Sequence, residues 1–306
     1  MRFLLRRLLG SFLVVFGTVT LVFLILHWLP GDPAVLIAGE DATEETIARI
    51  RAHLGTDRPL GVQYLAYLGG LLRGDLGISF ATREPVWRRL WGQFPATLAL
   101  TLMATSLALL LGIALGLLAA AQRGRWIDHA IQAVMLFLTA MPSFWLGILL
   151  ILIFSVTLQW LPAIGNGSLA QLILPMACLG LIAAGRLMRM VRNSVLDVLE
   201  EPFVTTLRAK GLREHRILFG HVLRNALIPV VTLLGIILGE LLSGAVVVET
   251  LFARQGLGRI VVDAVGVKDI PVLQGAVLMI SILFVLINLL VDLSYGVIDR
   301  RLRAGA

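Results

Sequence analysis

The sequence predicts an all-α integral membrane protein with six transmembrane helices, and three observations carry this prediction. Hydrophobic residues make up 58 % of the 306 residues and charged residues only 15 %, whereas a soluble domain carries about 25 % charge. Mean hydropathy is +0.92. Apolar runs of about 20 residues, the helical length that crosses a bilayer, recur along the chain. The composition therefore excludes disordered, collagenous and disulfide-rich classes.

Six apolar runs are long enough to span the membrane as helices, because a single segment must satisfy its own backbone hydrogen bonds there. They lie at about 8–29, 96–121, 130–158, 169–188, 228–248 and 272–295. The first run follows a basic start, as in a signal peptide. It is too long for one, however, and the following Trp-Leu-Pro-Gly-Asp-Pro offers no small-residue cleavage pattern. We therefore expect it to be a real span.

Lysine and arginine set the predicted orientation, because short cytoplasmic connections carry an excess of them. With the N-terminus inside, sixteen of the 26 Lys and Arg residues face the cytoplasm. Both termini are then cytoplasmic, and residues 30–95 form a long extracytoplasmic segment. We divide the chain into residues 1–95, the first span with this outer segment, and residues 96–306, a five-span core with an inner loop at 193–228.

The outer segment has helical patterns of its own. Asp41 and Glu44 resemble a capping box, and Gly55 is a stop signal for the helix that follows them. A second apolar stretch occupies residues 59–72. These helices predict either an amphipathic element lying on the membrane surface or a docking or gating surface.

The inner connection between spans four and five reads as two short helices joined by a glycine. Pro202 suits a helix N-terminus, and Gly211 suits a left-handed stop after about two turns. A second helix is expected from Glu214 to Ala226. Mixed basic and apolar residues fit two interpretations: a knob that inserts into a groove on another protein, or a helix pair resting on anionic lipid.

Polar residues inside the predicted spans are costly and call for a role. Glu240 lies near the middle of span five, and Asn288 and Asp292 share a face of span six. They predict a polar pathway lining or a hydrogen-bonded helix contact. Pairs of glycines four residues apart fit close helix packing. These are Gly112 with Gly116 and Gly235 with Gly239.

The sequence offers no catalytic residue and no metal site. No phosphate-binding loop of the Gly-x-x-x-x-Gly-Lys-Ser/Thr type occurs, nor does a His-Glu-x-x-His pattern, and the five histidines are scattered. Cys178 is the one cysteine, so it forms no internal disulfide. The chain therefore shows no nucleotide-binding loop of this type.

Several short motifs together resemble one family. The inner loop, with LRAKG at 207–211 and LRNALIP at 223–229, is similar to the cytoplasmic EAA loop of ABC-importer permeases. Nearly the whole chain resembles the B-type permeases of the dipeptide, oligopeptide and nickel importers. The other motifs are LPGDPA at 29–34, DRPL at 57–60, RGDLGIS at 73–79, PAT at 95–97, VETLF at 248–252, GLGR at 256–259, Asn288, and Val291 with Asp292.

The resemblance departs from the family at some positions. The loop's glutamate and first alanine are unmatched, since Thr206 and Leu207 stand there, and only Ala209 and Gly211 align securely. Gln255 and Arg300 stand where the family commonly has proline.

The resemblance implies partners. It implies a second homologous permease, two cytosolic ATP-binding subunits that use ATP and Mg, and an extracytoplasmic substrate-binding protein, in the bacterial inner membrane. No cofactor and no nucleic acid are expected on this chain, and lipid surrounds it. The implied ATPase-coupling residues lie in and beside the glycine turn. They are Phe203, Thr206, Leu207, Arg208, Ala209, Lys210, Gly211 and Leu212.

The cargo is the least determined feature. Residues 29–39 are similar to peptide and glutathione permeases, whereas residues 77–86 and 154–162 are similar to nickel permeases. We expect a peptide importer and keep a nickel or metal-chelate importer as the alternative. A self-sufficient secondary transporter is the alternative of another class, but the inverted repeats and matched broken helices of such proteins are not evident.

Overall fold

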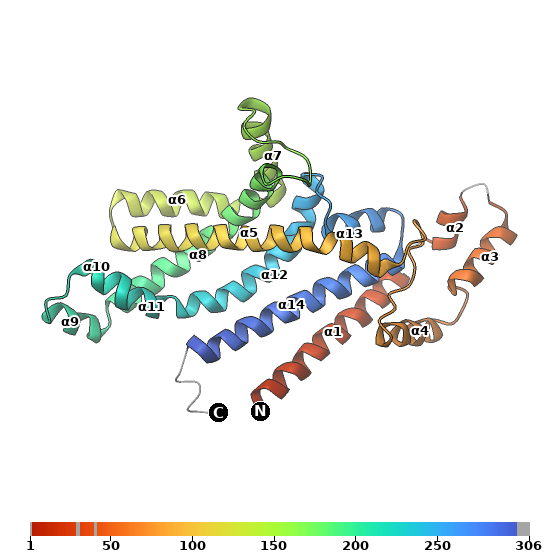
Figure 1. Cartoon of the computed structure of the whole chain (residues 1–306), viewed down its shortest axis with the longest axis horizontal. Helices are drawn as coiled ribbons and strands as arrows, with labels where there is room; N and C mark the ends of the chain where they lie inside the picture. The colour runs from red at the N-terminus through yellow and green to blue at the C-terminus, as the bar shows by residue number, and fades with distance from the viewer. Residues whose placement is uncertain (1, 29–30, 40–41, 299–306) are drawn as a thin grey trace. The chain divides into compact units, whose positions relative to one another are not determined.

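The computed structural model describes the backbone of residues 2–28, 31–39 and 42–298, and their side chains except at 2–6, 36 and 292–298. The described residues form α- and π-helices, with one isolated β-bridge between Ile78 and Pro85 (Figure 1). Among them, five helices are long and apolar enough to cross a membrane, and a bent helix pair makes a sixth candidate. The prediction of an all-α membrane protein is confirmed.

The helices follow one another along the chain. They are α1 (Arg2–Trp28), α2 (Pro33–Ala38), α3 (Glu44–Leu54), α4 (Leu60–Leu72), α5 (Val86–Ala121), α6 (Trp126–Ala140), α7 (Ser143–Leu150), the π-helix η1 (Ile151–Thr157), α8 (Ala170–Leu199), α9 (Pro202–Ala209), α10 (Glu214–Ile217), the π-helix η2 (Leu218–Val222), α11 (Leu223–Ala226), α12 (Ile228–Leu251), α13 (Leu257–Gly266) and α14 (Ile270–Ile298).

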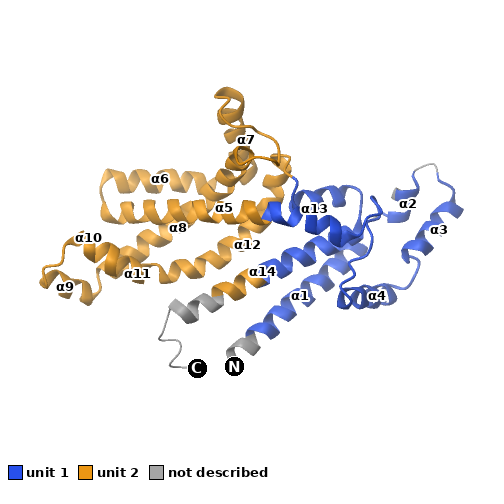
Figure 2. Cartoon of the chain, in the orientation of Figure 1, with its two compact units in different colours: residues 1–97, 255–285 blue, residues 98–254, 286–306 orange. Residues whose placement is uncertain are grey.

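The chain forms two compact units (Figure 2). Unit 1 comprises residues 1–97 and 255–285, and unit 2 comprises residues 98–254 and 286–306. The sequence predicts a boundary at residue 95 between the first span with its outer segment and the five-span core. That is a different kind of division from compact units, and it stays a prediction.

The third predicted span is not one straight helix. It breaks after Ala140, and α6 meets the helix formed by α7 and η1 at a bend of 107°. Met141 and Pro142 are both extended, with ψ of 136° and 139°. A residue that precedes proline is disfavoured in helical conformation, so Pro142 ends α6 and begins α7. The expectation of a continuous helix over 130–158 is wrong.

Two other spans are longer than their apolar runs. α5 begins ten residues before the predicted start, passing through Pro95. Its first turn belongs to the core of unit 1, where Val86 and Leu90 are fully buried against α13 and α14. α8 continues eleven residues past the predicted end at 188. In both extensions charged residues interrupt the apolar pattern of the sequence. Tertiary contacts stabilise the helix there instead.

The outer segment begins with helices close to those expected. Thr43, not Asp41, caps α3, because the Thr43 hydroxyl accepts from the Thr46 amide at 3.3 Å; Asp41 itself lies outside the described residues. Gly55 ends α3 with φ of 70°, as predicted. α4 is held to α1 by its polar residues. The Tyr64 hydroxyl lies 2.6 Å from that of Thr20.

A buried carboxylate fastens the rest of the outer segment within unit 1. Asp269, fully buried between α13 and α14, accepts hydrogen bonds from the Ser79 hydroxyl and, at 3.0 Å, from the Phe80 amide. The Arg89 guanidinium lies 3.8 Å away. At the other end of α13, the Leu257 amide donates to the Thr97 hydroxyl at 2.8 Å. The last bond joins the PAT and GLGR motifs, which lie 160 residues apart.

Unit 2 packs around α8. Gly112 and Gly116 let α5 approach closely, because a Cβ at these positions would lie 2.5 Å from Leu187 Cβ and 2.7 Å from Val191 Cβ. The prediction of close packing at this glycine pair is confirmed. α6 is tied to α8 by the buried Asp128, whose carboxylate accepts from Arg192 at 2.7 and 2.8 Å. Such bidentate pairs are the strong ones.

Candidate functional site

The inner loop between α8 and α12 has the helix–glycine–helix form that the sequence predicts. α9 starts at Pro202, in the first turn, where proline lacks only a hydrogen bond that the helix would not make. Gly211 follows with φ of 75°, a left-handed turn. The Arg208 guanidinium then reaches across this turn to the Glu214 carboxylate at 2.7 Å and joins the two helical parts.

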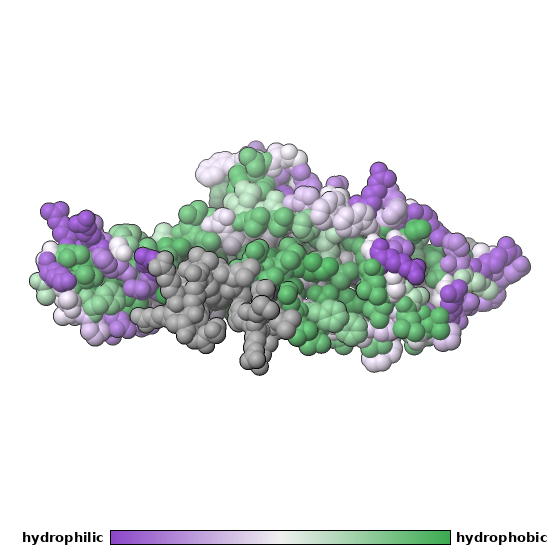
Figure 3. Space-filling model, turned by 60° about the horizontal axis from the view of Figure 1, so that its bottom comes forward, coloured by the Kyte–Doolittle hydropathy of each residue, from purple (hydrophilic) through white to green (hydrophobic). Residues whose placement is uncertain are grey.

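The second part of the loop is a run of α10, η2 and α11 rather than one regular α-helix. The π-segment widens the helix at residues 218–222. Its inner face is fully or almost fully buried. The residues of this face are Val204 from α9 with Ile217, Val222 and Ala226. Hydrophilic residues gather at the end of unit 2 that α9 and α10 form (Figure 3).

The predicted coupling residues divide into two groups. Leu207 and Leu212 are half-buried and pack against the core of unit 2. The others are exposed, and we call them the coupling surface. They are Phe203, Thr206, Arg208, Ala209, Lys210 and Gly211. The leucines therefore connect an exposed surface to the helices beneath it.

The electrostatics of the loop centre on one ion pair. The hydrogen bond from Arg208 lowers the pKa of Glu214 below its usual value, and the same bond raises the pKa of Arg208. Both side chains are largely exposed. The pair therefore stays charged at neutral pH and adds little stability of its own.

The second predicted set of residues lies on α12 and α14. Glu240 forms an ion pair with Arg186 of α8. Sequence reasoning missed this partner, because Arg186 stands near the end of an apolar run and reads as part of the basic inner loop. Asn288 Oδ1 lies 3.3 Å from where a Cβ of Gly235 would be, so α12 and α14 approach closely there. The side chain of Asp292 lies outside the described residues.

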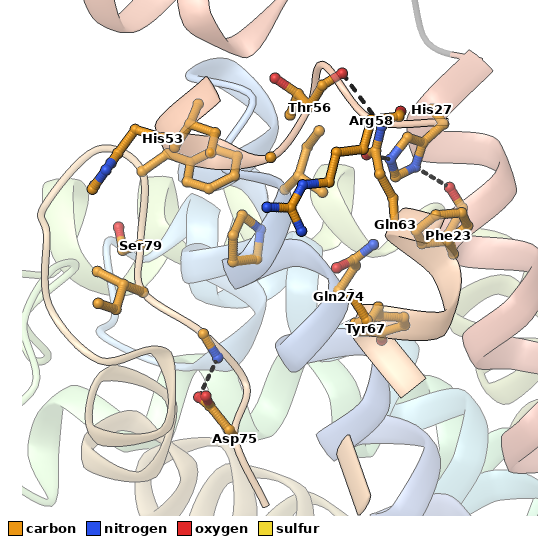
Figure 4. Close-up of a pocket in the computed structure, with 18 of the residues that line it drawn as sticks. Phe23, His27, His53, Thr56, Arg58, Gln63, Tyr67, Asp75, Ser79 and Gln274 are labelled. Atoms are coloured by element: carbon orange, nitrogen blue, oxygen red, sulfur yellow. Dashed lines mark hydrogen bonds between the residues drawn. The ribbon is translucent and has the colours of Figure 1, made fainter. Parts of the chain in front are cut away.

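Unit 1 contains a cavity of about 600 Å³ that the sequence does not predict, although residues of the DRPL and RGDLGIS motifs line it (Figure 4). Elements far apart in the chain form it: α1, α4, the two outer loops and the start of α14. Its polar lining includes His27, His53, Arg58, Gln63 and Gln274.

One side of this cavity is held by hydrogen bonds and aromatic packing. His27 Nε2 lies 3.0 Å from Gln63 Oε1. The Tyr67 ring stacks on Phe23 at 5.8 Å, and burial raises the pKa of Tyr67 to about 12. The tyrosine is therefore a neutral hydrogen-bonding group at any physiological pH.

Comparison with known families decides what kind of protein carries these features. A family model described as binding-protein-dependent transport system inner membrane component matches residues 112–304, and the N-terminal model of such components matches residues 1–101. The chain belongs to this family. It is an ABC-importer permease, a multi-pass protein of the bacterial inner membrane, and permease subunits are not themselves enzymes. The recognition from the sequence motifs is confirmed.

The permease is also similar to individual curated proteins over its full length. It is 44 % identical over 303 residues, 99 % of both chains, to the glutathione transport system permease protein GsiC of Salmonella typhi. The GsiC protein of Escherichia coli O6:H1 is 43 % identical over the same length. A putative peptide transport system permease of Brucella abortus strain 2308 is 41 % identical over 308 residues, 98 % of each chain.

Solved structures support the fold of the permease. Two inward-facing crystal forms of the MetNI methionine ABC transporter superpose with TM-scores of 0.59 and 0.55. Sequence identities are 21 % and 23 %, and the matches cover 68 % and 70 % of this chain and 94 % and 96 % of those chains. At these identities the likeness shows the fold alone.

Proposed function

We propose that this permease forms half of the membrane pathway of an ATP-driven importer whose cargo is a peptide, in the class of dipeptides, oligopeptides or glutathione. The observation that carries the proposal is the identity of 44 % over 99 % of both chains to glutathione permeases. Full-length similarity at this level supports a shared type of cargo as well as a shared fold.

The proposed partners follow from the family and from the exposed surfaces. A second homologous permease completes the pathway, two cytosolic subunits bind and hydrolyse ATP with Mg, and an extracytoplasmic binding protein delivers the cargo. This chain binds no cofactor. In the proposed orientation six spans place both termini and the α9–α11 loop in the cytoplasm, with residues 30–95 outside.

The coupling surface is the proposed contact with an ATP-binding subunit. Phe203 is 37 % exposed on a short helix whose other face is anchored to the core. Movement of the partner would be passed through Leu207 and Leu212 to α8 and α12, which is a rigid-body route to a change of access.

The outer cavity of unit 1 is the proposed place for contact with the binding protein. Its lining combines hydrogen-bonding and charged side chains from the outer segment, and the Asp269 contacts hold that segment in place. A concave surface that carries several polar side chains and is held in place suits repeated docking of a soluble partner.

A nickel chelate is the second candidate cargo, because residues 77–86 and 154–162 resemble nickel permeases. Among the described residues no group of three or more His, Cys, Asp or Glu side chains could hold a metal ion. A metal cargo would therefore have to be carried with its own chelator.

Uptake by the complete importer in proteoliposomes tests the proposal. We expect ATP-dependent accumulation of labelled glutathione or a dipeptide when the cognate binding protein is present, and none from this chain alone. Uptake of a nickel chelate but of no peptide would overturn the peptide assignment. Counterflow by the lone chain would indicate a secondary transporter instead.

A further inference from the structure

The Arg186–Glu240 ion pair stands in an unusual place. Arg186 lies in the interior of α8 and Glu240 in the interior of α12, each several turns from its helix ends. Charges at such depth face the protein interior or a water-filled pathway rather than lipid, because exposure to hydrocarbon is costly. The side chains are 33 % and 44 % exposed on this chain, so the pair is open on one side.

That open side faces a small cavity. It has a volume of about 150 Å³, and apart from the pair most of its lining is apolar. The other lining residues are Ser143, Leu179, Ile182, Ala183, Leu241 and Gly244. An apolar cavity with a few convergent polar groups is the usual form of a small-molecule site. This volume has room for a molecule the size of a dipeptide rather than for a long peptide.

The site also has more donors than its acceptor uses. Arg186 Nε is buried without a hydrogen-bond partner among the described residues. Unpaired buried donors are unfavourable, and guanidinium groups pair best with carboxylates.

We propose that Arg186 and Glu240 form a cargo site for zwitterionic peptides, in which Glu240 binds the ammonium group and Arg186 the carboxylate. The inference rests on the proposed peptide-import function and names the groups that recognise the cargo. Binding of a zwitterion replaces the ion pair between Arg186 and Glu240 with two ion pairs to the cargo. It brings no net charge into the membrane interior. A bare metal cation is disfavoured, since one carboxylate is a poor ligand set and Arg186 repels it.

A contrast on the same helix supports this assignment. Asp128 and Arg192 also join α8 to a neighbouring helix, but they are 1 % and 16 % exposed and make two hydrogen bonds. Asp128 also accepts from Gln132 and from the Gly124 amide. An ion pair that only holds helices together is buried and hydrogen-bonded on all sides in this way. Arg186 and Glu240 instead leave hydrogen-bonding atoms facing a cavity.

Cysteine protection in the assembled importer tests the site without relying on the binding protein. Ser143→Cys places a thiol in the cavity lining with little change of shape. The hydrogen bond that Cys178 makes to Ser143 uses the backbone carbonyl, which the substitution keeps. Its reaction with a small thiosulfonate is followed by mass spectrometry. At a concentration about ten times the dissociation constant, Ala-Ala should slow the reaction about ten-fold.

Two comparisons decide the outcome. N-acetyl-Ala-Ala-amide should not protect, and Glu240→Gln in the Ser143→Cys background should abolish protection by Ala-Ala. Glu200→Gln, which removes an exposed ion pair with Arg123, should leave protection unchanged. Equal protection by the blocked peptide, protection that survives Glu240→Gln, or no protection by any peptide would overturn the inference. Uptake by the wild-type importer reports separately on the proposed function.

Discussion

The outer segment and the inner loop are both helical segments between spans, but they are fastened in opposite ways. The outer segment is held by a carboxylate with no exposed surface, Asp269, that accepts from a hydroxyl and from backbone amides. The inner loop has one polar link across its glycine turn, the exposed pair of Arg208 and Glu214.

This difference has an energetic meaning. Breaking a buried and fully bonded charge leaves an unpaired group and costs several kcal/mol, whereas an exposed ion pair contributes about 0–1 kcal/mol. The outer segment is therefore built to keep one shape. The tip of the inner loop is anchored through apolar contacts on one face. Its other face is exposed, so binding of a partner can determine its conformation.

The largest expected effect is on the outer segment. Asp269→Ala should lower the stability of the purified permease by about 3 kcal/mol, because the Ser79 and Arg89 groups lose their buried acceptor. Thermal unfolding followed by tryptophan fluorescence measures this loss. Asp263→Ala is the matched control, since Asp263 is exposed and lies 3.8 Å from Arg259; it should change stability little. Equal effects of the two changes would contradict the contrast.

The next effect concerns the turn of the inner loop. Gly211→Val should cost about 1–2 kcal/mol locally, because a side chain disfavours the left-handed conformation. No other atom lies within 4 Å of the position of a Cβ, so the fold and assembly should persist. ATP hydrolysis stimulated by the loaded binding protein should be lost. Measurement of this activity in nanodiscs gives the test.

Gly211→Asn is the control for that substitution. Asparagine tolerates the left-handed conformation better than valine and adds a side chain of similar bulk. It should keep much of the stimulation. If valine leaves stimulation at the wild-type level, the turn plays no part in coupling.

The smallest expected effect comes from the exposed ion pair. Glu214→Gln should change stability by under about 1 kcal/mol, since both partners are solvated. Because Arg208 lowers the pKa of Glu214, this small contribution is present at neutral pH and is lost as pH falls through that lowered pKa. Unfolding measured at pH 7 and at acidic pH should therefore show the wild type and the variant converge. A stability difference between the wild type and the variant that stays constant with pH would exclude the ion pair as its source.

The sequence predicts well where one local rule governs the chain. Apolar runs locate α1, α12 and α14, and Pro202 and Gly211 mark the ends of α9. These features depend on residues next to one another, so no tertiary information is needed.

The sequence predicts poorly where distant residues decide. The first turns of α5 are stabilised by contacts with α13 and α14, and the end of α8 by the pair of Arg192 with Asp128. The partners of Glu240 and Asp269 are 54 and 190 residues away in the chain. Periodicity cannot reveal such pairs, and the outer cavity likewise needs the fold to assemble it.

Photo-crosslinking from position 210 tests the central claim most directly. Lys210 lies on the exposed tip of the inner loop, beside Gly211. With a benzophenone amino acid at this position in the assembled importer, we predict crosslinks to an ATP-binding subunit that change in yield when ATP is added. Crosslinks to lipid alone, with and without ATP, would contradict the role of this loop in coupling.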